Sequence, residues 1–219
     1  MAEIVLADTS PVIYLARIEG LPWLKEIFGY IAVTSVVRRE LLPPADLPEK
    51  SAIEAAIVDG TLREIADEWA LPIYSGLGEG EDSTIRVAVN LSRRGHYCHV
   101  LVDDKQARKV LQALASEKLD FAGTAAVVAR AKRLGLVDSV AAELDKLRQA
   151  GFRLSDEVAR SVLESVDESF EAWLPLAPSK IRLRTGSASP LTPPLHILPS
   201  PRHNESPQTA TIRGADLIR

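Results

Sequence analysis

Cysteine is almost absent from this sequence. Cys98 is the only one among 219 residues, so the chain can form neither an internal disulfide nor a thiolate metal site of its own. We therefore expect any bound metal to have oxygen ligands. Long apolar runs are also missing, because none approaches the roughly 20 residues that a membrane helix needs. Residues 1–15 show neither a basic n-region nor a small-residue cleavage site, which predicts a soluble, cytoplasmic protein.

An excess of positive charge is lacking as well. The net charge is −4, and residues 173–219 hold six Lys and Arg against two Asp and Glu. Residues 1–172 therefore carry 20 basic and 28 acidic side chains. Such an acidic body gives no argument from bulk charge for binding nucleic acid.

Composition divides the chain into two parts. The last 47 residues hold eight of the fourteen prolines and show no sustained hydrophobic period. We expect residues 173–219 to be a Pro-rich, disordered tail. Residues 1–172 are long enough to bury a core of their own and are expected to form one domain.

Short apolar runs alternate with helical patterns throughout residues 1–172, which is typical of a sheet covered by helices on both faces. Strands are expected over residues 4–7, 30–33, 62–65, 99–102 and 120–122. Helices are expected from Pro11 to Gly20, around residues 23–28, from Thr34 or Ser35 to Pro43, and over residues 49–59, 81–93, 105–118, 124–134, 138–150 and 155–166.

Acidic residues follow two of these strands. Asp8 comes after the first strand, and Asp103 and Asp104 come after residues 99–102. Open α/β sheets place their sites outside the carboxyl ends of the strands, so these acids are expected to be neighbours. Glu40, in the last turn of a helix, and Glu81, at the start of another, add two more. Clustered carboxylates raise one another's pKa unless a hard cation neutralises them, and Mg²⁺ or Mn²⁺ suits such oxygen ligands.

Each of these acids also has an ordinary structural interpretation. Asp8 and Asp104 could cap the helices that follow them, and Glu81 could favour the positive end of a helix. Glu40 could be a solvated surface residue. His96 and Cys98 lie before the strand rather than after it, so we interpret both as structural.

Four motifs occur in an order and spacing typical of one family. They are Asp8-Thr9-Ser10-Pro11, Glu40 at a helix end, Gly76-Leu77-Gly78-Glu79-Gly80-Glu81, and Val102-Asp103-Asp104-Lys105-Gln106-Ala107-Arg108. In this combination the chain resembles the PIN-domain superfamily, and more narrowly the branch of predicted nucleic-acid-binding PIN proteins related to VapC-type toxins. The resemblance covers about residues 3–168.

The resemblance implies a three-layer α/β/α sandwich with a mostly parallel central sheet. It also implies a Mg²⁺- or Mn²⁺-dependent endoribonuclease that hydrolyses RNA phosphodiester bonds. The matching positions make Asp8, Glu40, Glu81 and Asp104 the catalytic residues, and Asp8, Glu81, Asp103 and Asp104 the metal ligands. In the toxin branch the acid at the helix start is usually aspartate, whereas here it is Glu81.

RNA is the partner that the resemblance implies, and the toxin branch adds a cognate antitoxin and a homodimer. The expected substrate-binding side chains are polar or basic and lie close in sequence to the acids: Ser10, Arg38, Arg39, Lys105 and Arg108.

Two other classes of function remain as alternatives. One is a PIN-like body without catalysis that serves as an RNA-binding or protein-interaction scaffold. The other is a phosphotransfer protein, although phosphatases of the haloacid-dehalogenase type need aspartate where Ser10 stands, and receiver domains need an early acidic doublet. Dinucleotide binding is less favoured, because the glycines at 76–80 lack the G-x-G-x-x-G spacing.

Overall fold

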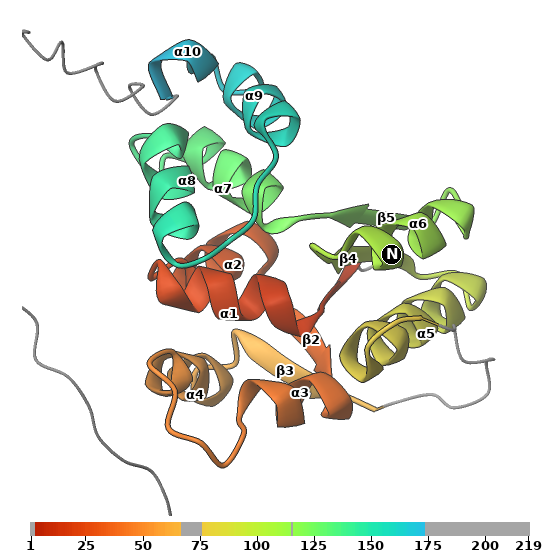
Figure 1. The fold of residues 1–219 in the computed structure, drawn as a ribbon. Helices are drawn as coiled ribbons and strands as arrows, with labels where there is room; N and C mark the ends of the chain where they lie inside the picture. The colour runs from red at the N-terminus through yellow and green to blue at the C-terminus, as the bar shows by residue number, and fades with distance from the viewer. Residues whose placement is uncertain (1–2, 67–75, 115, 174–219) are drawn as a thin grey trace, which may run out of the picture. The chain divides into compact units, whose positions relative to one another are not determined.

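Five parallel strands form one sheet in the order β3-β2-β1-β4-β5 (Figure 1). The structure is a computed structural model that describes residues 3–66, 76–114 and 116–173, all within one unit, Met1–Pro175. The strands are β1 (Glu3–Ala7), β2 (Ile31–Thr34), β3 (Leu62–Ile65), β4 (Tyr97–Leu101) and β5 (Leu119–Ala122). Of the tail expected over residues 173–219, residues 174–219 lie outside the described residues.

Helices cover both faces of the sheet. They are α1 (Thr9–Arg17), α2 (Leu21–Phe28), α3 (Ser35–Leu41), α4 (Lys50–Val58), α5 (Glu79–Arg93), α6 (Lys105–Ala113), α7 (Thr124–Arg133), α8 (Val140–Gln149), α9 (Asp156–Glu164) and α10 (Phe170–Trp173). Within the described ranges, no helix is long and apolar enough to cross a membrane.

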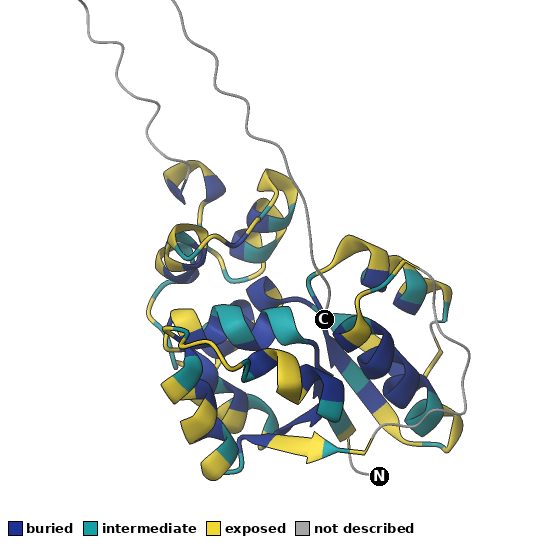
Figure 2. Ribbon diagram, turned by 60° about the horizontal axis from the view of Figure 1, so that its bottom comes forward, coloured by how far each residue is buried: buried dark blue, intermediate teal, exposed yellow. Residues whose placement is uncertain are grey.

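The alternation of side chains along the strands produces two hydrophobic cores. Val5 and Ala7 of β1 face the core shared with α1, α2, α4 and α7, whereas Leu6 faces the core shared with α5 and α6. The central strands are therefore buried on both sides, and β3 at the sheet edge is exposed in its middle (Figure 2). The expected three-layer α/β/α sandwich is confirmed, and its described sheet is parallel throughout.

The strand order fixes where a ligand site can form. The chain runs outward from β1 to β3 on one side and then returns to place β4 on the other side of β1. The strand order therefore reverses between β1 and β4, and crevices outside the carboxyl ends of strands form at such switch points. Asp8 follows β1, and Asp103 and Asp104 follow β4, so all three lie at this end of the sheet.

Several element boundaries differ from the expectations. Helix α5 begins at Glu79 instead of Glu81, and α6 ends at Ala113 instead of residue 118, because a turn closed by Ser116 leads directly into β5. The expected boundary between residues 172 and 173 falls inside α10. Trp173 is only 5% exposed and stacks under the Arg148 guanidinium at 4.0 Å, so it belongs to the folded domain.

Candidate active site

Asp8 is a buried acid at the carboxyl end of β1. Its backbone N–H donates to the Leu101 carbonyl oxygen at 3.0 Å, which extends the pairing of β1 with β4 by one residue. The residue is 4% exposed, and no Lys, Arg or His of the described residues forms an ion pair with it. Burial, with smaller contributions from the carboxylates of Glu81 and Glu40, raises the pKa of Asp8 to about 7. The structure therefore brings these three acids into one electrostatic site.

Capping does not explain Asp8 well. It is the N-cap residue of α1, but its side chain forms no capping hydrogen bond of normal geometry. The N–H groups of Thr9 and Ser10 lower its pKa without offsetting the effect of burial. The third helical position is Pro11, which has no N–H to offer. A buried carboxylate with so few partners is what a cation site requires.

Glu40 extends from α3 toward the start of α5 and is held there by two groups. The Thr9 hydroxyl donates to Glu40 Oε2, and the Gly80 N–H donates to Oε1 at 3.1 Å. A Cβ at position 80 would lie 2.5 Å from Oε2, so a larger residue there would displace the Glu40 carboxylate. The expected start of the helix at residue 81 left Gly80 outside it, and no contact between Gly80 and Glu40 was predicted.

Glu81 lies in the first turn of α5 and folds back over the helix start. Its Oε2 accepts the Gly78 N–H at 2.8 Å, in the arrangement of a capping box. With this cap the helix starts at Glu79, so the start expected at residue 81 was wrong. Glu79 itself is exposed and is a natural control for Glu81.

The two aspartates after β4 have different environments. Asp104 is exposed and caps α6, because its Oδ1 accepts the N–H groups of Gln106 at 2.6 Å and Ala107 at 2.9 Å. Asp103 accepts both the N–H and the hydroxyl of Thr124, at 2.9 and 2.6 Å. Burial raises the pKa of Asp103 although Thr124 and Arg108 act against the rise. The capping role that we considered for Asp104 is therefore present, and it uses only one carboxylate oxygen.

Arg108 connects Asp103 to the backbone of β4. Its Nε donates to the Val102 carbonyl oxygen at 3.0 Å, and its Nη2 lies 3.6 Å from Asp103 Oδ1. A Cβ at Gly123 would overlap this guanidinium, so a larger residue where β5 passes into α7 would displace Arg108. Neither Gly123 nor Thr124 was assigned a role from the sequence.

The other residues expected to bind substrate lie around this edge. Arg38 is engaged by Glu64 at 2.9 Å, whereas Arg39 and Lys105 are exposed. Ser10 is half-buried in the first turn of α1. His96 precedes β4 and Cys98 lies in its first half, at the opposite end from Asp103 and Asp104.

The chemistry of the acids suits a hard divalent cation. Asp8, Glu40 and Glu81 supply only carboxylate oxygens, and the high pKa of Asp8 reflects first its burial and then the negative charge of Glu81 and Glu40. Within residues 3–66, 76–114 and 116–173, however, no group of three or more Asp, Glu, His or Cys stands close enough to hold one ion. Glu40 and Glu81 both accept backbone N–H groups at the start of α5, from Gly80 and Gly78.

Comparison with known proteins identifies a family. A family model described as a PIN domain matches residues 4–168. No curated protein and no solved structure matches the chain. PIN domains are generally nucleases that typically bind divalent metals, and the match spans every acid considered above. The chain therefore belongs to the PIN-domain family.

Proposed function

We propose that this protein is a Mg²⁺- or Mn²⁺-dependent endoribonuclease. The observation that supports it most is the buried Asp8 carboxylate, whose pKa of about 7 is raised in part by Glu81 and Glu40. A folded protein keeps such mutual repulsion chiefly where a cation relieves it. In a PIN domain, that cation serves phosphodiester hydrolysis.

The residues of the site have different proposed roles. Asp8, Glu81 and the Asp103–Asp104 pair are the proposed metal ligands, and Glu40 completes the catalytic set with them. The metal would orient and activate water and stabilise charge on the leaving oxygen. Thr9 and Gly80 hold Glu40 against the end of the sheet, and Thr124 fixes Asp103 from the neighbouring strand end.

A PIN domain that binds RNA without cutting it is the second candidate. The observation in its favour is that Glu81 and Asp104 both cap helices. Among the described residues, no three acids lie close enough together to coordinate one ion. In that case the acids would stabilise the fold, and RNA would bind at this edge of the sheet without metal-dependent cleavage.

Cleavage of single-stranded RNA in Mn²⁺, compared with EDTA, separates the two candidates. We expect the wild type to cut only with metal, and Asp8→Asn and Asp104→Asn to lose the activity. Asparagine keeps the acceptor oxygen that caps α6, so the second variant changes charge without removing the cap. Glu79→Gln is the matched control and should cut like the wild type. Metal-independent RNA binding with no cleavage would favour the scaffold.

The toxin role rests on the resemblance to the VapC-like branch. It predicts that the product of a short adjacent reading frame binds the protein and blocks cleavage, and that the protein is a homodimer. Co-expression followed by light scattering tests both. If the protein is a monomer, and if the product of the adjacent reading frame does not relieve the growth defect that expression of the protein causes, the toxin role is contradicted. The nuclease proposal would then stay intact.

A further inference from the structure

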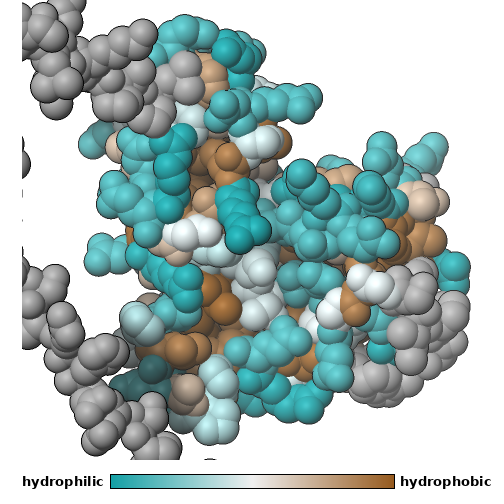
Figure 3. Space-filling model, viewed as in Figure 1, coloured by the Kyte–Doolittle hydropathy of each residue, from teal (hydrophilic) through white to brown (hydrophobic). Residues whose placement is uncertain are grey.

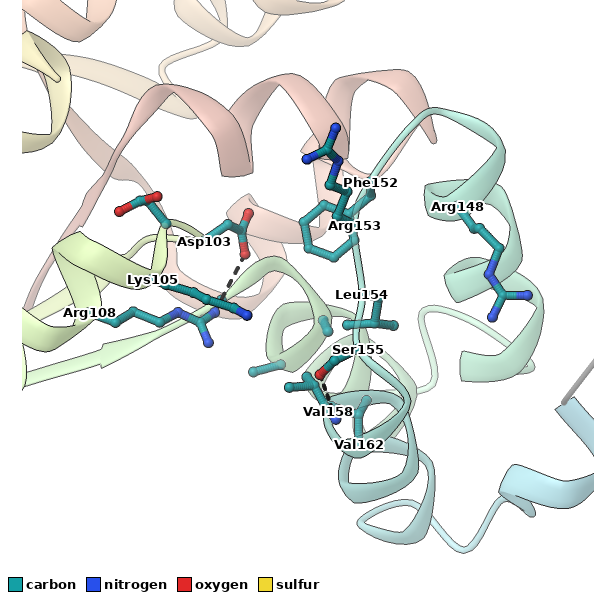
Figure 4. A pocket seen from close by; sticks show the side chains of 14 residues that line it. Asp103, Lys105, Arg108, Arg148, Phe152, Arg153, Leu154, Ser155, Val158 and Val162 are labelled. Atoms are coloured by element: carbon teal, nitrogen blue, oxygen red, sulfur yellow. Dashed lines mark hydrogen bonds and ion pairs between the residues drawn. The ribbon is translucent and has the colours of Figure 1, made fainter. Parts of the chain in front are cut away.

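A cavity of about 840 Å³ adjoins the acidic edge of the sheet. One wall is the start of α6, with Asp103, Asp104, Lys105 and Arg108. The start of α7 forms the floor, and the segment between α8 and α9 forms the opposite wall (Figure 4). The two aspartates belong both to the cavity and to the proposed catalytic set, so a chain bound at the site would continue into this space.

The cavity is cationic although the domain as a whole is acidic. Four basic side chains line it against two aspartates. Arg148 is already engaged, because its guanidinium lies 4.0 Å from the Trp173 ring centre, and Arg108 is tied to the β4 end. Lys105 and Arg153 are exposed, and neither has an ion pair or hydrogen bond within the part of the chain that the structure describes.

These two free cations lie on opposite walls. Lys105 extends from the start of α6 toward the α8–α9 segment, which carries Arg153 (Figure 4). Arg108 reaches in the same direction as Lys105. The cavity therefore has a basic side chain on each of these two walls.

Apolar side chains complete the lining. Ala126 is exposed, and Leu154, Val158 and Val162 are half-buried. Figure 3 shows hydrophobic surface between hydrophilic side chains in the middle of this face. Phe152 forms a rigid part of the wall, because its ring packs edge-on against Tyr14 at 4.9 Å.

We propose that this cavity binds one nucleotide of the RNA strand beside the bond that is cut. Its phosphate would lie between Lys105 and Arg153, and its base would lie against the apolar side chains of α7 and α9. A nucleotide combines these two features, whereas inorganic phosphate offers only the charge. This assignment rests on the proposed ribonuclease function, because it takes the strand to run from the acids into the cavity.

Binding of fluorescein-labelled single-stranded RNA in EDTA tests the assignment without cleavage. Lys105→Gln and Arg153→Gln should each weaken binding about five- to tenfold, and each should lower the slope of log affinity against log salt by about 0.7. Ala126→Trp fills the cavity without changing charge and should also weaken binding. Lys109→Gln, on the exposed face of the same helix, is the matched control, since Lys109 does not line the cavity. Thermal melts of each variant check that the fold is unchanged.

The outcomes separate the two proposals. If the wild type cuts RNA in Mn²⁺ and the three cavity variants bind and cut as it does, the cavity assignment is wrong and the nuclease stands. If the wild type does not cut RNA but the cavity variants lose RNA binding, the nuclease proposal fails and the cavity remains a nucleotide site. Loss of binding to a poly-glutamate peptide, with RNA binding unchanged, would show that the cavity receives a protein and overturn the assignment.

Discussion

The titration of Asp8 makes a quantitative prediction about the metal-free protein. Burial and two neighbouring carboxylates raise its pKa from 3.8 to about 7. The folded state thus holds this proton more tightly than the unfolded chain does. Its stabilising effect is complete below pH 4 and is lost as the pH rises through about 7. A shift of about three pH units corresponds to about 4 kcal/mol in the free energy of unfolding.

Replacing Asp8 with asparagine should remove this dependence. The amide carries no charge, so in EDTA the variant should match or exceed the wild type in stability at pH 8, by up to about 4 kcal/mol. Near pH 4 the two proteins should differ little. Asp103 and His99 also have shifted pKa values, but both residues are present in the two proteins, so the difference between them isolates Asp8.

Urea unfolding followed by tryptophan fluorescence, from pH 4 to pH 8.5 in EDTA, measures the effect. The difference in the free energy of unfolding between variant and wild type should grow with pH and level off above pH 7. Parallel curves over the whole range would refute the reasoning. A variant that is strongly destabilised at every pH would show that Asp8 is a structural cap.

Three further predictions follow from particular contacts. Gly80→Ala should reduce RNA cleavage at least about tenfold, because overpacking displaces Glu40. Gly78→Ala should retain activity, since a Cβ there meets its nearest atom at 3.5 Å. Equal activities of the two variants would contradict the Glu40 contact. Trp173→Ala should cost about 3 to 5 kcal/mol in urea unfolding, and a change below about 1 kcal/mol would place Trp173 outside the core. Cys98 is 3% exposed and burial raises its pKa to about 11, so a thiol reagent should modify it only as fast as the domain unfolds; rapid modification of the native protein would contradict this burial.

The architecture was predictable because its signals are local. Continuous apolar runs followed by acids give buried strands, and parallel strands must bring their carboxyl ends to one edge. This reasoning placed Asp8, Asp103 and Asp104 at one end of the sheet before the strand order was known.

The missing details depend on contacts between distant segments. The Gly80–Glu40 hydrogen bond joins residues 40 positions apart, and the fit of Gly123 under Arg108 needs β4, β5 and α6 to be in place. The start of α5 depends on which way the Glu81 side chain turns, which composition does not indicate. Trp173 was assigned to the tail because proline follows it closely, although its ring belongs to the core.

Counting bound Mn²⁺ by electron paramagnetic resonance tests the central claim, that the acids at the strand ends form one metal centre. Titration of the metal-free wild type should reveal bound ions. Asp8→Asn should weaken the binding at least about tenfold, since it removes the most buried charge from the site. Glu79→Gln should bind as the wild type does. Equal Mn²⁺ binding by the wild type and Asp8→Asn would contradict the account.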